Sequence, residues 1–107
     1  MKQYLDQQQT AKLIELGFEK PTMKNVPTPE GEVNEEWYSI GYLIEMLPQT
    51  IYVFYDLSIM SSHKGWWVLY GMIGDGDMWS IEHKVYRNEL IDALYDMVVK
   101  LKEEGII

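Results

Sequence analysis

The chain has 107 residues, of which 47% are hydrophobic and 24% charged, a size and composition that fit one globular domain with a single core. Nine basic and seventeen acidic residues give a net charge of −8, which opposes a phosphate backbone and argues against direct nucleic-acid binding. The absence of cysteine excludes disulfides and thiolate metal sites. No run reaches the roughly 20 apolar residues of a membrane helix, and the N-terminal segment lacks the apolar stretch of a secretory signal. We therefore expect a cytoplasmic protein that does not associate with membranes.

The first predicted element is a helix that starts after Asp6 and ends at Gly17. Asp6 and Gln9 have the three-residue spacing of a capping box, in which each side chain binds the backbone amide of the other residue. Residues 20–36 follow, and their prolines and glutamates interrupt any helical or strand period. Within them, residues 28–31 fit a type I turn with proline in the second position. The segment predicts a long, acidic, Pro-rich loop or a loose hairpin.

Two further helices are predicted from apolar residues that recur on one helical face. The first covers residues 40–47, where Ser39 suits the N-cap position and Pro48 forces the end. The second begins after Asn88 as the cap and ends at Gly105. Its apolar stripe consists of Leu90, Ile91, Leu94, Met97, Val98 and Leu101. This stripe predicts the main anchor of the fold, because each buried large apolar side chain contributes about 1.5–3 kcal/mol.

Between these helices lie two aromatic-rich segments, residues 51–59 and 65–73, which we interpret as strands of one hairpin. Residues 78–86 fit either a third short strand or irregular structure. The predicted fold class is α+β: a small antiparallel sheet, centred on the 51–59/65–73 hairpin, packs against the C-terminal helix. Two shorter N-terminal helices lie alongside, and residues 1–107 form a single domain.

The residues from which a metal or hydrolytic centre could be built are His63, Asp75, Asp77 and His83. Their spacing matches neither an HExxH arrangement nor a calcium loop. Two aspartates flanked by glycines are also what a tight turn requires. No serine stands in a GxSxG elbow. We therefore predict no catalytic residue, metal ion or cofactor, and a small metal-dependent or hydrolytic enzyme that uses these four residues is the alternative.

The aromatic residues suggest a contact surface. The sequence has four tryptophans and eight tyrosines, more than one small core can enclose when each buries roughly 150–250 Å². Consecutive residues of a strand point to opposite faces, so one of Trp66 and Trp67 must point away from the last helix. We expect that indole to mark a protein-binding surface, with Tyr52 or Phe54 beside it. The plainer interpretation is that helices cover both sheet faces and leave the rings only partly exposed.

A second candidate surface is acidic. The sequence contains no lysine or arginine between Lys24 and Lys64. A basic partner could contact four glutamates of the Pro-rich segment: Glu30, Glu32, Glu35 and Glu36. The plainer interpretation of these glutamates is a solvated face that keeps the protein soluble. A third interpretation, an acidic mimic of nucleic acid, requires these carboxylates to lie on a rigid surface.

Three stretches of the chain carry a resemblance. QTAKLIELGF at Gln9–Phe18, YSIGYLIEMLPQTI at Tyr38–Ile51 and ELIDALYDMVVKLKEEGII at Glu89–Ile107 resemble a set of small uncharacterised proteins from gut bacteria and their phage or mobile elements. The resemblance covers about half of the chain and implies a phage or mobile-element origin, without an activity. Taken together, the sequence predicts a non-catalytic module that binds an unidentified protein partner, and self-association is also open.

Overall fold

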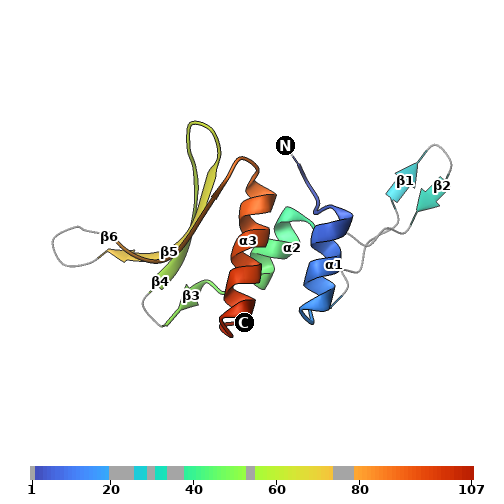
Figure 1. Ribbon diagram of the computed structural model, residues 1–107. Coiled ribbons are helices and arrows are strands. Elements are labelled where there is room, and N and C mark those ends of the chain that lie inside the picture. Colours follow the sequence, from blue (N-terminus) through green and yellow to red (C-terminus); the bar gives the residue numbers. More distant parts are fainter. Residues whose placement is uncertain (1, 20–25, 29–30, 34–37, 53–54, 74–78) are drawn as a thin grey trace.

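Figure 1 shows the computed structural model, which describes residues 2–19, 26–28, 31–33, 38–52, 55–73 and 79–107. The helices are α1 (Gln7–Glu15), α2 (Ile40–Met46) and α3 (Leu90–Glu103). The strands are β1 (Val26–Thr28), β2 (Gly31–Val33), β3 (Thr50–Ile51), β4 (Tyr55–Ser61), β5 (Trp66–Ile73) and β6 (Trp79–Arg87). β1 and β2 pair only with each other, while the other four strands form one antiparallel sheet in the order β3-β4-β5-β6. The predicted α+β class is confirmed, and α3 packs on the sheet.

The caps of the first two helices are those that the sequence predicts. Asp6 accepts a hydrogen bond from the backbone amide of Gln9, and the Gln9 side chain accepts one from the amide of Asp6. Gly17 follows α1 with a φ of 98°, a left-handed conformation that glycine adopts without a steric penalty. Ser39 caps α2 by accepting from the amide of Tyr42 at 3.1 Å. These local interactions explain where both helices begin, independently of tertiary packing.

The cap predicted for α3 is wrong. Glu89, not Asn88, occupies the N-cap position, and it makes no side-chain cap hydrogen bond. Its carboxylate instead accepts a hydrogen bond from the backbone amide of Lys2 at 3.1 Å. The N-terminal segment thus binds at the start of α3, and a contact between residues so far apart in the chain leaves no local signal in the sequence.

An ion-pair network continues this attachment. Lys2 Nζ donates to Asp92 Oδ1 at 2.9 Å, and Gln9 Nε2 donates to the same oxygen at 2.8 Å. Burial alone raises the pKa of Asp92, but the hydrogen bonds from Gln9 and Lys2, together with the positive charges of Lys2 and Arg87, lower the pKa overall. Asp96 accepts from Arg87, and this hydrogen bond raises the pKa of the guanidinium. The network joins the N-terminal segment, the end of β6 and the first turns of α3.

The strand predicted over residues 51–59 is wrong as one element. Residues 50–51 form β3, the chain turns at Tyr52, and β4 runs antiparallel with Thr50 opposite Asp56. Tyr52 has a φ of 49°, which is unusual for a residue with a bulky side chain. In the sequence, the alternation of apolar residues over 51–59 continues through this turn, so periodicity could not reveal the reversal of the chain.

Residues 78–86, for which the sequence allowed either a short strand or irregular structure, correspond to a full strand. β6 spans nine residues and pairs along the whole of β5, with a β-bulge between Tyr70 and Gly71. The second predicted strand, residues 65–73, is confirmed as β5 with its start one residue later. β1 and β2 correspond to the loose hairpin that was one of the two interpretations of residues 20–36.

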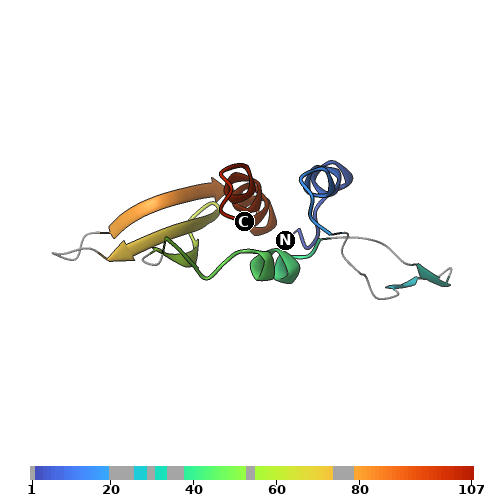
Figure 2. The same cartoon turned by 90° about the horizontal axis from the view of Figure 1, so that it is seen from below.

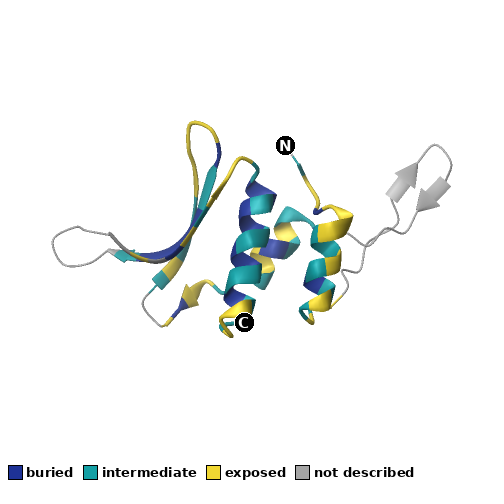
Figure 3. Cartoon of the chain, viewed as in Figure 1, coloured by how far each residue is buried: buried dark blue, intermediate teal, exposed yellow. Residues whose placement is uncertain are grey.

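The core lies where α3 meets one face of the sheet on one side and α2 on the other, as the buried residues in Figure 3 show. All six residues of the predicted α3 stripe are buried, and all except Leu90 are completely inaccessible to solvent. Figures 1 and 2 place the three helices on the same side of the four-stranded sheet. Among the helices of the described segments, none combines the length and apolar character that a bilayer crossing requires.

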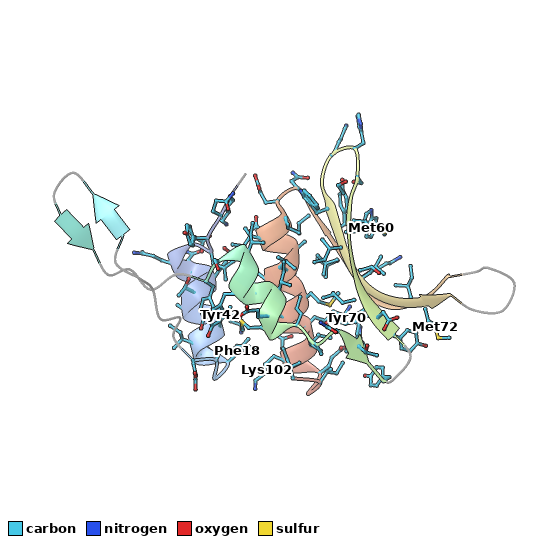
Figure 4. All side chains as sticks on the ribbon, turned by 180° about the vertical axis from the view of Figure 1, so that it is seen from behind. Phe18, Tyr42, Met60, Tyr70, Met72 and Lys102 are labelled. Carbon is cyan, nitrogen blue, oxygen red and sulfur yellow. The ribbon has the colours of Figure 1, made fainter. Side chains whose placement is uncertain are left out.

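Tyr70 lies at the centre of this core. Its ring is completely buried, and Figure 4 shows it pointing from β5 toward the helices. The hydroxyl donates a 2.6 Å hydrogen bond to the carbonyl oxygen of Pro48, which satisfies the polar end of the buried ring. Burial raises the pKa of the Tyr70 hydroxyl far above its ordinary range. This bond ties the sheet to the segment that follows α2.

Candidate binding surface

The two faces of the sheet differ in what covers them. We call the face that packs on α3 the inner face and the opposite one the outer face. Trp66, Val68 and Tyr70 of β5 contact the core and belong to the inner face. Trp67 and Leu69 alternate with them and are absent from that core cluster, so they belong to the outer face. None of the described helices or strands packs on the outer face (Figures 1 and 2).

The strand register gathers apolar side chains on the outer face. Met60 and Tyr86 lie on either side of Trp67, one on β4 and the other on β6. Further along β6, Ile81 lies opposite Gly71 of β5, which has no side chain to cover it. We define the outer-face patch as Met60, Trp67, Leu69, Ile81 and Tyr86. Ser58, Lys84 and Asp56 occupy the polar positions around it.

Three members of the outer-face patch are well exposed, with accessible fractions of 46% for Met60, 45% for Ile81 and 39% for Tyr86. Figure 4 shows Met60 on the side of β4 that faces away from the helices. The rings of Trp67 and Tyr86 pack at a centroid distance of 4.9 Å, inclined by 47°. Ser62 donates a 3.2 Å hydrogen bond to the Tyr86 hydroxyl. The ring pair is therefore held in place before any partner arrives, which reduces the entropy that binding would cost.

The sequence-predicted aromatic residues divide between the two faces. Trp67 lies in the outer-face patch, whereas Trp66 packs against the core. Tyr52 is 54% exposed but lies in the turn between β3 and β4, where its ring contacts Tyr55 at 6.4 Å. It therefore does not lie beside Trp67, as we had expected from the uninterrupted strand. Phe54 lies outside the described residues.

The acidic candidates fall largely beyond what the structure describes. Glu30, Glu35 and Glu36 lie outside the described residues, and Glu32 lies in β2, whose side chains are also outside them. The rigid row of carboxylates that a nucleic-acid mimic requires is thus not among the described features. The acidic surface and the mimic both stay predictions.

The histidines of the enzyme alternative lie on different parts of the sheet. His63 is exposed in the connection between β4 and β5. His83 is buried opposite Tyr70, on the inner face. His63 precedes the start of β5, whereas His83 pairs with Tyr70 near the middle of that strand. The five residues from Gly65 to Tyr70 span about 16 Å at roughly 3.3 Å per residue, so the two histidines lie about that far apart along the strand. Asp75 and Asp77 lie outside the described residues.

His83 has a structural partner instead. Its Nε2 atom lies 3.0 Å from Glu104 Oε2, just past the end of α3. The pair lacks hydrogen-bond geometry, so the contact is electrostatic and depends on protonation of the ring. Within the described part of the chain, no three His, Asp or Glu side chains are placed to hold a metal ion. The described geometry therefore offers no convergent site for the enzyme alternative.

Sequence reasoning missed Met60, Ile81 and Tyr86 as members of a surface. The available signal was the pairing of β5 with β6, which places Tyr86 beside Trp67 once the register is known. No protein-family model, curated protein or solved structure matches this chain. The outer-face patch is therefore interpreted from its own geometry.

Proposed function

We propose that the protein is a non-catalytic binding module that recognises another protein through the outer-face patch. The observation that supports this most is the preassembled pair of the partly exposed Trp67 and the exposed Tyr86, flanked by Met60 on the neighbouring strand. Tryptophan and tyrosine are enriched among the residues that dominate binding energy at interfaces. A cluster of large apolar side chains on an uncovered sheet face is also a common mark of an interaction site.

The polar surroundings fit the same proposal. Ser58, Lys84 and Asp56 stand at the sides of the apolar positions, as the polar rim of a protein interface does. The resemblance of the sequence to proteins of gut bacteria and their phage supports a role as a cytoplasmic accessory protein of a phage or mobile element. That part of the proposal rests on the resemblance alone.

The test compares three immobilised proteins: wild type, the double variant W67T/Y86T, and Y52N as the control. Threonine favours strands, so the double variant should keep its fold. Y52N removes an exposed aromatic ring outside the outer-face patch, and asparagine tolerates the left-handed backbone of that position. Circular dichroism must first show that all three proteins are folded.

Each immobilised protein is exposed to a host-cell lysate, and we expect wild type and Y52N to retain proteins that W67T/Y86T does not retain. Calorimetric titration with the purified partner should then show at least roughly 30-fold weaker binding to the double variant. Light scattering on the free proteins tests self-association. If wild type is a dimer and W67T/Y86T is a monomer, the partner is a second copy of this chain. Equal retention by wild type and W67T/Y86T, confirmed by equal affinities, would refute the proposal.

A further inference from the structure

A groove lies between the end of α2 and the β3–β4 hairpin, apart from the outer-face patch. We call it the α2–β4 groove. Its volume is about 700 Å³, and its lining residues are Ile44, Glu45, Leu47, Gln49, Thr50, Asp56 and Leu57. This volume falls within the roughly 300–1,000 Å³ of typical binding pockets. The groove thus has room for a side chain together with part of the backbone that bears it.

The lining combines an apolar floor with two negative charges. Ile44 is 37% exposed although it lies on the apolar side of α2, and Leu57 is only partly buried. Asp56 is oriented by the Thr50 hydroxyl, which donates to Oδ1 at 3.0 Å, and among the described residues no donor binds the second carboxylate oxygen. Glu45 is exposed, and the described residues supply it with no cationic partner.

The described lining of the groove carries negative charge and no positive charge. Among the described residues, no lysine or arginine lines the groove, and none occurs in the sequence between Lys24 and Lys64. A long aliphatic stem that ends in a cation matches both parts of this lining, because it places methylene groups on Ile44 and Leu57 and its charge between the carboxylates. Arginine and lysine are the protein side chains with this construction.

The edge of β4 suggests how such a side chain arrives. β3 is so short that it pairs only with Tyr55 and Asp56, and the amide of Leu57 donates to the Gln49 carbonyl at 2.8 Å as the last bond on this side. Among the described strands, none covers this edge from Ser58 to Ser61. Alternation directs the amide and carbonyl of Ile59 toward the open edge. An extended partner segment can pair there while its neighbouring side chain enters the groove.

We propose that the α2–β4 groove binds an arginine or lysine side chain of an extended segment of a partner protein. The probe is a synthetic peptide, acetyl-Thr-Val-Arg-Val-Thr-amide, and its control contains citrulline, a neutral isostere, in place of arginine. The measurement is the shift of backbone amide signals in nitrogen-15 NMR spectra during titration at low salt. We expect shifts at Glu45, Asp56 and Ile59, and binding on the order of tenfold weaker for the citrulline peptide.

Variants separate this site from other acidic surfaces. E45Q/D56N should bind the arginine peptide as weakly as wild type binds the citrulline peptide. E15Q/E19Q removes the same number of charges from exposed positions at and just beyond the end of α1 and should leave binding unchanged. W67T/Y86T should also bind normally, so failure of the proposed function and failure of this inference are distinguishable.

Several results would overturn the inference. Equal affinities for the arginine and citrulline peptides, or shifts confined to other acidic regions, would show that the groove does not select a cation. The absence of shifts at millimolar peptide would have the same meaning. Spermidine that fills the groove as tightly as the peptide would assign the site to small polyamines and not to a protein segment.

Discussion

Leu94 offers the sharpest test of the core, and we expect L94D to unfold the protein. The side chain is completely inaccessible to solvent and lies on the buried face of α3. Replacing a buried leucine by a small side chain costs about 2–5 kcal/mol, and burying a polar group without a partner adds about 1–3 kcal/mol. This total of roughly 3–8 kcal/mol rises by several kcal/mol for a carboxylate that stays charged, so it matches or exceeds much of the range of about 5–16 kcal/mol expected for the stability of 107 residues, at 0.05–0.15 kcal/mol each.

The assay is urea denaturation followed by far-ultraviolet circular dichroism, with L94A and M60D measured alongside. L94A should remain folded and lose about 3 kcal/mol, because it leaves a cavity without a polar group. M60D makes the same apolar-to-acidic change on the exposed outer face and should cost about 1 kcal/mol or less. These two variants show whether position in the fold, and not the aspartate itself, causes the effect.

A soluble L94D protein that unfolds cooperatively within about 1 kcal/mol of M60D would refute this assignment of the core. The same conclusion would follow if M60D proved as damaging as L94D, because the outer face would then be the buried one.

Two further predictions concern single contacts. D92N should destabilise the protein by about 1–2 kcal/mol at pH 7. The pKa of Asp92 is lower in the folded protein than in the unfolded chain, so its ionised carboxylate stabilises the fold fully above the unfolded pKa of about 3.9, and this contribution is lost as the pH falls through the folded pKa. Denaturation at pH 7 and pH 2.5 should show the difference in stability from wild type shrink, and a constant difference would contradict this prediction. G65A should destabilise by about 1–3 kcal/mol, because the added methyl carbon would meet the Arg87 carbonyl oxygen at 2.5 Å. G41A, in open space on α2, should instead stabilise by about 0.5–1 kcal/mol, and equal melting temperatures for the two variants would argue against the close approach.

The elements with strong local signals were predictable from the sequence. The capping box of α1, the serine cap of α2 and the apolar stripe of α3 depend on residues a few positions apart, and the structure confirms them. The side chain at the start of α3 binds the distant Lys2, and the reversal at Tyr52 accompanies the pairing of β3 with β4. Such long-range causes leave no periodic pattern, and these are the elements that the sequence analysis assigned wrongly.

The binding surface was predictable only in part. Alternation required one of two adjacent indoles to leave the core, and the packing of α3 decides that it is Trp67. The neighbours predicted for it came from the wrong element, because Tyr52 turns away before β4 begins. Met60 and Tyr86 become its neighbours through the registers of β4 and β6, which depend on hairpin connections and not on the composition of any one strand.

The alternation of Trp66 and Trp67 also supplies two built-in optical reporters. Because one indole packs against the core and its neighbour lies on the uncovered face, the emission of Trp66 should shift to the red when the chain unfolds, whereas that of Trp67 should respond to molecules that settle on the sheet. With Trp37 and Trp79 replaced by phenylalanine, and each remaining indole kept in turn, fluorescence would follow unfolding and recognition separately in the same protein.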